Sequence, residues 1–420
     1  MPRKGTTTTR GVKPPTRSKP HVRTGPAKPP RSARRPARGG TKRDDEGTGG
    51  RGAATSAKRP AKRPVTPAPK KAAKKAAKPP VRAAGTPPDV EAQLRAIEHG
   101  DGDGELELGR GKRLHVSSLG RVVFPEAGVT KGGVMRYYAR LSRFLLPDID
   151  GRPLILKRYP TGVDGEMFFQ QDAGPHVPDV VRVDQVETVD KGKQDRIIGG
   201  DLATLLYTVQ IGAIEVHPWF SRVGDIEHPD RSLIDLDPGE GVPFAWVVEL
   251  AQEIVRIARQ CELPVVLKTS GSRGIHLVFP LPARTTYDTS LALAELVARA
   301  ATVARPDLAT VERSIRSRPA KSIYVDAMQN SHGKSMASAY SLRAKPAATA
   351  SAPLRPRELT PRLKLTGFTV ATMPARTERI GDIWREGLSE RPTARALARA
   401  MQALETTLVA TPPKQGGRRS

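Results

Sequence analysis

Two aspartates separated by one residue, Asp235 and Asp237, are the residues whose types and spacing most directly suggest chemistry. On a β-strand, side chains two positions apart point to the same face, about 7 Å from each other. Ile234 and Leu236 would then turn the other way into a core. Paired carboxylates suit hard cations that take oxygen ligands. Two such ions about 4 Å apart serve in-line phosphoryl or nucleotidyl transfer.

The aspartate pair alone does not name a reaction. An Asp-x-Asp sequence before a Pro-Gly turn also occurs in exposed turns, where the carboxylates cap backbone N–H groups, and in phosphatases and glycosyltransferases. A third carboxylate, Asp326, ends the apolar run 322–326, which predicts another strand. The predicted catalytic and metal-binding residues are therefore Asp235, Asp237 and Asp326.

The segment 270–276 has the composition of a phosphate-binding turn. Gly271 and Gly274 allow tight backbone turns that expose N–H groups to an anion, Ser270 adds a hydroxyl, and Arg273 adds a guanidinium. It is not a Walker sequence, because no Gly-Lys-Ser/Thr opens a helix. A plain hairpin turn between two strands is the alternative interpretation of the same residues.

Further positions carry polar or aromatic chemistry. His217 follows an apolar run, where a lone histidine more often fills a core or caps an element, and Arg343 is placed to reach a phosphate. Phe168 and Phe169 are adjacent on an expected strand, so they cannot both face one core. An exposed phenylalanine beside a basic groove stacks on nucleic-acid bases, although such pairs also simply pack.

These residues need strands and helices to bring them together. Apolar residues at helical spacing predict helices over 89–99, 130–146, 203–211, 243–263, 291–303 and 393–408. Alternation and short apolar runs predict strands within 105–116, 121–125, 154–159, 232–237, 264–268, 275–279 and 322–326. Several neighbouring strands form predicted hairpins and no Rossmann glycine fingerprint occurs, so we expect an α+β fold rather than a doubly wound sheet.

The first ninety residues differ from the rest in composition. They hold 25 of the 70 Lys and Arg residues, 4 of the 43 Asp and Glu, 16 of the 39 Pro, and no Phe, Trp or Tyr. Such a segment cannot bury enough apolar surface to offset chain entropy, so we expect a disordered basic tail over 1–89. Its Lys-Ala-Pro repeats resemble linker-histone tails and predict DNA binding through counterion release. A solvated tail that binds nothing specific is the alternative.

The remaining sequence predicts one catalytic domain over 90–410 and a disordered basic C-terminus over 411–420. The single cysteine excludes an internal disulfide and a cysteine-based zinc site. No apolar run approaches the ~20 residues of a membrane span, and the N-terminus lacks an apolar signal segment. We therefore expect a cytoplasmic, nucleoid-associated protein with no membrane partner.

Nine stretches, each weak alone, occur in one order along the chain. They are Arg-Val-Val-Phe-Pro at 121–125, Thr-Lys-Gly at 130–132, Gly-Glu-Met-Phe-Phe-Gln at 165–170, Asp-Leu-Ala-Thr-Leu-Leu-Tyr at 201–207, Gly-Ala-Ile-Glu-Val-His-Pro-Trp at 212–219, His-Pro-Asp-Arg at 228–231, Asp-Leu-Asp-Pro at 235–238, Lys-Thr-Ser-Gly-Ser-Arg-Gly-Ile-His at 268–276 and Tyr-Ser-Leu-Arg at 340–343. Together they resemble the primase-polymerase domain of bacterial multifunctional DNA ligase D, a branch of the archaeo-eukaryotic primase superfamily used in non-homologous end joining. The resemblance covers roughly residues 105–390.

The resemblance implies a fold and a set of roles. The fold is an RRM-like palm with an additional α/β subdomain packed against it. The three aspartates would bind two divalent cations, Mn²⁺ or Mg²⁺, one acting on the primer 3′-hydroxyl and the other on the triphosphate. The residues expected to bind the incoming nucleotide are Ser270, Arg273, His276 and Arg343 at its phosphates and His217 at its sugar or phosphates.

The resemblance also implies DNA contacts and partners. Arg121 and Lys131 match positions that grip the 5′-phosphate of a downstream strand, and Phe168 and Phe169 match residues that stack on template bases. An ATP-dependent ligase needs a Lys-x-Asp-Gly nucleophile, and the nearest string, 162–165, lacks the lysine. We therefore expect DNA gaps or ends and NTP or dNTP as substrates, with a Ku-like end-binding protein and a separate ligase as partners.

The sequence departs from the family at a few positions. Gln171 stands where lysine is usual, Gly200 stands where asparagine is frequent, and Arg121 and Arg273 replace lysines and keep the charge. None of these departures removes an expected metal ligand.

Three hypotheses about function follow. The first is a nucleotidyltransferase that fills gaps and extends DNA ends, preferring ribonucleotides, in double-strand-break repair. The second is a non-catalytic nucleoid or DNA-end-binding protein in which the tail carries the function. The third is a primase that starts strands de novo at the same site. The complete acidic triad favours the first hypothesis over the second, whereas the sequence does not separate the first from the third.

Overall fold

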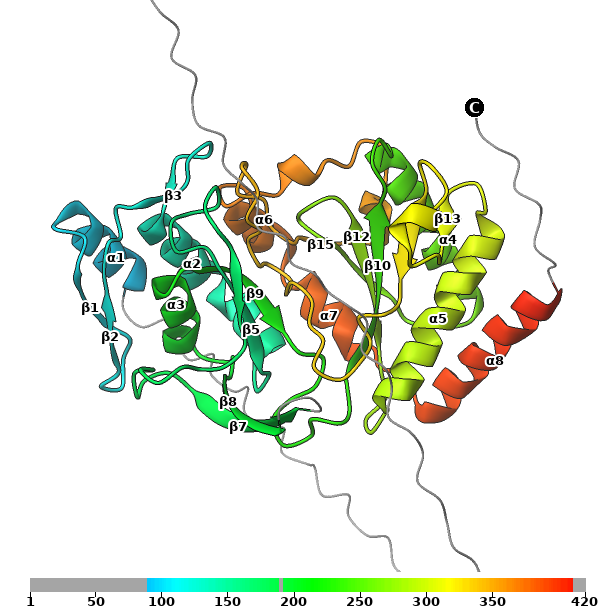
Figure 1. Ribbon diagram of the computed structural model, residues 1–420, viewed down its shortest axis with the longest axis horizontal. Helices are drawn as coiled ribbons and strands as arrows, with labels where there is room; N and C mark the ends of the chain where they lie inside the picture. Colours follow the sequence, from blue (N-terminus) through cyan, green and yellow to red (C-terminus); the bar gives the residue numbers. More distant parts are fainter. Residues whose placement is uncertain (1–88, 189–191, 411–420) are drawn as a thin grey trace, which may run out of the picture. The chain divides into compact units, whose positions relative to one another are not determined.

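The strand β10 (Arg231–Pro238), which carries Asp235 and Asp237, lies at the centre of the largest sheet (Figure 1). This computed structural model describes residues 89–188 and 192–410, so nearly all of the predicted tail over 1–89 and the predicted C-terminus over 411–420 lie outside the described residues. The strand order is β13-β14-β10-β12-β11-β15, and every neighbouring pair is antiparallel except β13 and β14. The other five strands are β11 (Val266–Thr269), β12 (Ile275–Pro280), β13 (Ala309–Thr310), β14 (Ile323–Asp326) and β15 (Pro353–Leu354).

The order of elements along the chain gives this sheet an RRM-like core. Apart from the two-residue β13 that precedes β14, it runs β10, α4 (Phe244–Gln260), β11, β12, α5 (Tyr287–Ala304) and β14. This is the β-α-β-β-α-β sequence of ferredoxin-like and RRM folds. The two helices pack against β10 and its neighbours β12 and β14. The expected α+β fold with an RRM-like palm is confirmed.

The alternation of side chains along β10 separates the core from the functional face. Ile234 and Leu236 are fully buried, and the Ser232 hydroxyl donates to the Ser290 carbonyl of α5 at 2.9 Å. Even-numbered residues therefore face the helices. The odd-numbered Asp235 and Asp237 face the opposite side of the sheet, as the sequence predicts.

A second group of elements packs beside this core (Figure 1). Its three-stranded sheet has the order β6-β5-β9, and helices α2 and α3 pack on each other, with α3 also contacting β9. Its elements are α1 (Val90–His99), β1 (Gly104–Glu107), β2 (Arg113–Val116), β3 (Val122–Phe124), β4 (Val129–Thr130), α2 (Lys131–Ile149), β5 (Leu154–Arg158), β6 (Phe168–Gln170), β7 (Val183–Thr188), β8 (Gly192–Ile197), α3 (Leu202–Gln210) and β9 (Ala213–Pro218).

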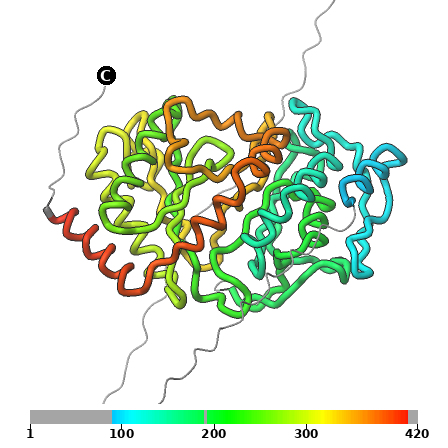
Figure 2. The backbone as a smooth tube through the Cα atoms, turned by 180° about the vertical axis from the view of Figure 1, so that it is seen from behind, coloured from blue at the N-terminus to red at the C-terminus, as the bar shows by residue number. Residues whose placement is uncertain are grey.

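The segment 338–352 connects the two sheets. Ser338 donates its N–H to the Val216 carbonyl of β9 at 2.9 Å, and the Ala352 carbonyl accepts from Thr269 of β11 at 2.9 Å. Figure 2, the view from behind, shows the stretch that follows, in orange and red, running across this side of the molecule and ending in α8. This stretch holds α6 (Met373–Ile380), α7 (Ile383–Ser389) and α8 (Ala394–Ala410), of which α8 packs on α5.

The helix ends show where periodicity misplaces boundaries. Thr130 caps α2 as predicted, accepting from the Gly133 N–H at 2.9 Å. Helix α5 starts four residues before the predicted 291, because Thr286 caps a first turn that is too polar to show helical periodicity. Helix α4 ends at Gln260 rather than at the predicted 263. Two residues after this end, Glu262 adopts a positive φ of 53°, which is not helical. Among the helices of residues 89–188 and 192–410, none has the length and apolarity that crossing a bilayer requires.

Candidate active site

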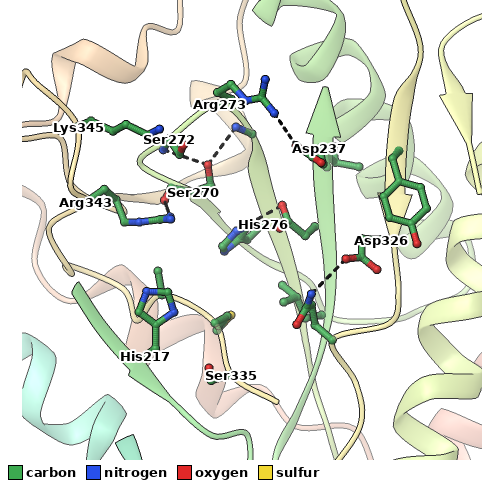
Figure 3. Close-up of a pocket in the computed structure, with 18 of the residues that line it drawn as sticks. His217, Asp237, Ser270, Ser272, Arg273, His276, Asp326, Ser335, Arg343 and Lys345 are labelled. Carbon is green, nitrogen blue, oxygen red and sulfur yellow. Dashed lines mark hydrogen bonds and ion pairs between the residues drawn. The ribbon is translucent and has the colours of Figure 1, made fainter. Parts of the chain in front are cut away.

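The structure brings the three predicted aspartates to one cleft. Asp235 of β10 and Asp326 of β14 are register partners, and Asp237 lies opposite Tyr324 in the same strand pair. All three carboxylates line a cleft of about 720 Å³ (Figure 3). The predicted convergence of two strand ends is therefore seen, and it follows from the antiparallel pairing of β10 with β14.

The carboxylates differ in electrostatic environment. Burial alone would raise the pKa of Asp235, but the nearby His276 and Lys268 outweigh it, and the net shift is downward. The pKa of Asp237 is raised, first by burial and then by the neighbouring charge of Asp235. Asp326 also raises it, while Arg273, whose guanidinium lies 3.4 Å from Asp237, opposes the rise. The three negative charges thus repel one another across the cleft.

The three carboxylates, and the repulsion between their negative charges, fit a site for divalent cations. Asp235, Asp237 and Asp326 offer only carboxylate oxygens, which Mg²⁺ and Mn²⁺ prefer. Within the described part of the chain, no three acidic, histidine or cysteine side chains already converge on a single point. Asp326 instead accepts from the Met328 N–H at 2.8 Å and from the Gln329 amide at 3.3 Å. Holding an ion would therefore require rotation of these carboxylates, whose shared repulsion a cation would relieve.

The turn between β11 and β12 packs directly against β10. A Cβ added to Gly274 would sit 2.0 Å from the Leu236 carbonyl oxygen of β10, so only glycine permits this approach. The Ser270 hydroxyl accepts from the N–H groups of Ser272 at 3.1 Å and Gly274 at 3.0 Å. The expectation that the turn exposes its N–H groups to an anion is therefore wrong for these two groups, because the serine side chain already satisfies them.

His276 lines the cleft but faces protein atoms with both ring nitrogens. Its Nδ1 lies 2.5 Å from the Lys268 ammonium, and its Nε2 lies 3.4 Å from an oxygen of Asp235. Burial, followed by the charge of Lys268, lowers the pKa of His276 to about 4. This geometry lets His276 orient Asp235, and its predicted contact with nucleotide phosphates remains a prediction.

Cationic side chains surround the carboxylates on the open side of the cleft. Arg273 is exposed beside Asp237, and Arg343 enters from the segment that connects the sheets, donating to the Ser270 carbonyl (Figure 3). Arg318 and Lys345 also line the cleft, and sequence reasoning missed both. The Arg318 guanidinium lies 3.9 Å from the centre of the Tyr324 ring. The basic run before β14 was the available signal for Arg318, but it matched no motif.

His217 reaches the same cleft from the other sheet. It lies on β9, its side chain is 16% exposed, and its Nε2 lies 2.8 Å from a carboxylate oxygen of Glu215. Its hydrogen bond with Glu215 fits the interpretation of His217 as a satisfied core or capping histidine, and its place in the cleft lining leaves the predicted nucleotide contact a prediction. The cleft therefore draws its residues from both sheets.

The predicted DNA-contacting residues lie outside the cleft. Lys131 starts α2 and donates its backbone N–H to the Arg121 carbonyl at 2.8 Å, so the two cations are neighbours. Arg121 is exposed, whereas Lys131 is buried and its ammonium donates to the Ser117 carbonyl at 2.8 Å. Burial, followed by the charge of Arg121, lowers the pKa of Lys131 to about 8.

The two adjacent phenylalanines are both exposed. Phe168 and Phe169 lie on β6, at the edge of the three-stranded sheet, with 45% and 60% of their surfaces exposed. The Arg158 guanidinium lies 5.0 Å from the centre of the Phe168 ring. The sequence predicts that one of the pair is exposed, and the edge position of β6 exposes the second as well.

Comparison with known proteins agrees with this geometry. The family described as "LigD, primase-polymerase domain" matches residues 130–384. The multifunctional non-homologous end joining protein LigD of Pseudomonas aeruginosa is 30% identical over 308 residues, covering 73% of this chain and 36% of that protein. The bifunctional non-homologous end joining protein LigD of Bacillus subtilis is 32% identical over 270 residues, covering 64% of this chain and 43% of that protein.

A solved structure shares the fold. The polymerase domain of Mycobacterium tuberculosis ligase D, in complex with DNA, superposes with a TM-score of 0.61 at 30% identity. The match covers 67% of this chain and 99% of that domain. The chain spans less than half the length of these two curated relatives, and the residues 130–384 that match the family contain the three aspartates. This chain belongs to the LigD primase-polymerase domain family.

Proposed function

We propose that this protein is a DNA-directed nucleotidyltransferase that adds nucleotides, preferentially ribonucleotides, to the 3′ ends of DNA at gaps and breaks. One observation carries the proposal. Asp235, Asp237 and Asp326 share one face of paired strands, beneath a turn and a connecting segment that bring Arg273 and Arg343 to the same cleft. Carboxylates for cations, next to guanidiniums for phosphates, match the needs of triphosphate chemistry.

The residues divide into two tasks. The three aspartates would hold two divalent cations, Mn²⁺ or Mg²⁺, which supply a lowered pKa for the attacking hydroxyl and neutralise the leaving pyrophosphate. Arg273 and Arg343 would bind the triphosphate oxygens through their guanidinium groups. Before the nucleotide arrives, Arg273 pairs with Asp237 at 3.4 Å. Nucleotide binding would move Arg273 from Asp237 to phosphate and free the carboxylate for a cation.

Residues outside the cleft would hold the DNA. Arg121, together with Lys131 beside it, would bind the 5′-phosphate of the strand downstream of a gap. Phe168 and Phe169 would stack on template bases, since both rings are exposed on an edge strand. The support for these roles is the exposure of Arg121 and the two phenylalanines and the charge of Arg121 and Lys131, together with the family match.

The cellular role is proposed from the relatives. The P. aeruginosa and B. subtilis proteins are named for non-homologous end joining, so we infer that this chain acts in the same repair process. A separate ligase would then seal the strands, and a Ku-like protein would hold the ends. The basic segment 1–88 would add affinity for DNA without sequence preference.

The decisive experiment is incorporation at a defined gap. The purified protein is incubated with Mn²⁺, a labelled single-nucleotide-gap DNA with a downstream 5′-phosphate, and either ribo- or deoxyribonucleotides. We expect templated addition that prefers ribonucleotides and is lost in Asp237→Ala. Glu240→Ala, which removes an exposed carboxylate after the end of the same strand, should stay active. Extension by Asp237→Ala at the normal rate would refute the proposal.

Deletion of residues 1–88 distinguishes the enzyme from a non-catalytic DNA-binding protein. We expect the deleted protein to retain incorporation on short substrates while binding long duplex DNA more weakly and with a smaller salt dependence. Full DNA binding by wild type without any incorporation, under either metal or nucleotide, would favour the architectural role. Incorporation without a primer would add the primase activity.

A further inference from the structure

A buried carboxylate, Glu215, contacts two cleft residues from different parts of the chain, His217 and Arg343. It lies on β9, two residues before His217, and only 2% of it is exposed. A buried carboxylate without partners would be costly, so its contacts show what it stabilises. Each of its two oxygens has a different set of partners.

One oxygen, Oε1, fixes Glu215 in the core. It accepts a hydrogen bond from the Ala344 N–H at 3.1 Å and lies 3.3 Å from the Lys157 ammonium and 3.4 Å from the Tyr159 hydroxyl. Lys157 and Tyr159 come from β5 and its end, and Ala344 comes from the segment that connects the sheets. These three donors hold the carboxylate in one orientation.

The other oxygen, Oε2, faces the cleft residues. The His217 Nε2 lies 2.8 Å from it, and the Arg343 Nε donates to it at 3.0 Å. A second nitrogen of Arg343 donates to the Ser270 carbonyl, so the guanidinium bridges Glu215 and the turn between β11 and β12. One oxygen atom therefore sets the orientation of both cleft residues.

We infer that Glu215 is a positioning residue for nucleotide binding, which fixes Arg343 against the turn and presents His217 to the cleft as a hydrogen-bond acceptor. The inference rests on the proposed function. Because an ionised carboxylate only accepts, the His217 proton must lie on Nε2 when the ring is neutral. Nδ1 then carries a lone pair, which suits an O–H or N–H donor of the nucleotide rather than a phosphate oxygen.

The electrostatics agree with this assignment. Burial would raise the pKa of Glu215, but the hydrogen bond from His217 and the charge of Arg343 outweigh it, and the net shift is strongly downward. Burial lowers the pKa of His217, which keeps the ring neutral. Glu215 is thus ionised and His217 uncharged near neutral pH. The groups that face this pair are Lys157, Tyr159 and Arg343.

Replacing Glu215 with glutamine would change the hydrogen-bonding group that His217 presents to the cleft from an acceptor to a donor. With its amide oxygen in the Oε1 position, the glutamine turns its NH₂ group toward His217 and Arg343. That NH₂ cannot accept a hydrogen bond from Arg343, so the Arg343 contact is lost. It donates to His217 Nε2 instead, so the ring proton moves to Nδ1 and Nδ1 becomes a donor. We expect Glu215→Gln to weaken nucleotide affinity by about 10- to 100-fold, the effect of losing a charge-assisted hydrogen bond.

The test measures nucleotide binding and catalysis separately. Binding of a fluorescent ATP analogue in the presence of Mn²⁺ is titrated for wild type and Glu215→Gln, and KM and kcat are measured on the gapped DNA. We expect the dissociation constant and KM to rise together while kcat changes less than threefold. In a background of His217→Ala and Arg343→Ala, Glu215→Gln should add less than about twofold, because its partners are already gone.

Two controls separate positioning from general destabilisation. Asp148→Asn removes another buried carboxylate, which pairs with Arg231 at 2.6 Å. We expect it to lower Tm but to leave the nucleotide dissociation constant within about twofold of wild type. Tyr159→Phe removes the longest of the three contacts to Oε1, so we expect a smaller rise in the dissociation constant than in Glu215→Gln. If Glu215→Gln does not fold, Glu215→Asp, which keeps the charge but shortens its reach, should fold and show the same loss of affinity.

The outcomes decide the inference independently of the proposed function. A folded Glu215→Gln or Glu215→Asp protein with wild-type nucleotide affinity would overturn it, as would a fall in kcat alone. Equal losses of affinity in Asp148→Asn would also overturn it, because the effect would then reflect stability. A wild-type protein that binds the ATP analogue but adds no nucleotide would refute the proposed function while leaving the positioning role measurable.

Discussion

Asp235 and Asp326 occupy directly opposite positions on neighbouring antiparallel strands, with both carboxylates on the cleft face. Like charges directly opposite each other in a sheet are destabilising. The core of the fold therefore carries a local cost at the place where the proposed chemistry occurs. Removing one of the two charges should therefore affect the stability of the protein as well as its activity.

Removing one of the paired charges should separate activity from stability. We expect Asp326→Asn to lower incorporation by about 10²-fold or more, since an electrostatic contact at the reaction centre is lost. The asparagine oxygen can still accept from the Met328 N–H, so the metal-free variant should melt at or above the wild-type Tm. Calorimetry without metal, beside a gap-filling assay, measures both effects. A clear fall in Tm would show that the favourable contacts of the Asp326 carboxylate outweigh its repulsion by Asp235.

The close approach of Gly274 to β10 makes this position intolerant of any side chain. Gly274→Ala would place a methyl group 2.0 Å from the Leu236 carbonyl oxygen, so the turn must move. We expect a loss of about 1–3 kcal/mol of stability from overpacking, with a rise in KM for the nucleotide. Gly367→Ala is the matched control, because a Cβ there meets nothing within 4 Å. Equal effects at both glycines would exclude the steric explanation.

Recognition of a downstream 5′-phosphate should weaken with rising pH. Burial lowers the pKa of Lys131 to about 8, so its ammonium is mostly charged at pH 7 and mostly neutral at pH 9. The preference for 5′-phosphorylated over 5′-hydroxyl gapped DNA should therefore decline across this interval, as measured by fluorescence anisotropy. Lys131→Arg, which stays charged, should remove the decline. An equally steep decline in that variant would assign the effect to another group.

The exposed aromatic pair should contribute to DNA binding without contributing to stability. Phe169 is 60% exposed, so Phe169→Ala should leave Tm nearly unchanged. We expect it to weaken binding of gapped DNA by about 1–3 kcal/mol, the range for stacking one base. Phe169→Leu keeps apolar area but loses the flat ring, and it should show most of the same loss. Wild-type affinity in both variants would mean that the ring does not stack.

Local patterns predicted much of the architecture correctly. The alternation around Asp235 gave the right strand and face, since side chains on a strand alternate strictly between its two sides. The predicted helices 130–146 and 243–263 appear as α2 and α4 with shifted ends. The hairpin of β7 and β8 was not predicted, because its residues are polar and mostly exposed, which leaves no apolar pattern to detect.

The parts of the site that sequence could not supply depend on contacts between distant segments. No sequence pattern indicates a role for Glu215, because its partners come from β9, β5 and the segment around Arg343, which meet only in the folded structure. The Ser270 hydroxyl accepts from two N–H groups within its own turn, so those N–H groups are taken, whereas the predicted donation of its own proton to phosphate stays a prediction. Residue types and spacing reveal candidate groups, whereas hydrogen-bond partners decide which atoms remain available to a ligand.

The outermost strands of the six-stranded sheet, β13 and β15, have a further consequence for self-association. Each contains only two residues, so the sheet offers little unpaired backbone to a neighbouring copy. Long, flat edges template intermolecular pairing and aggregation, and short ones resist it. The strands that carry the carboxylates lie inside these short edges, so this sheet has little tendency to join the sheet of another copy into a fibre.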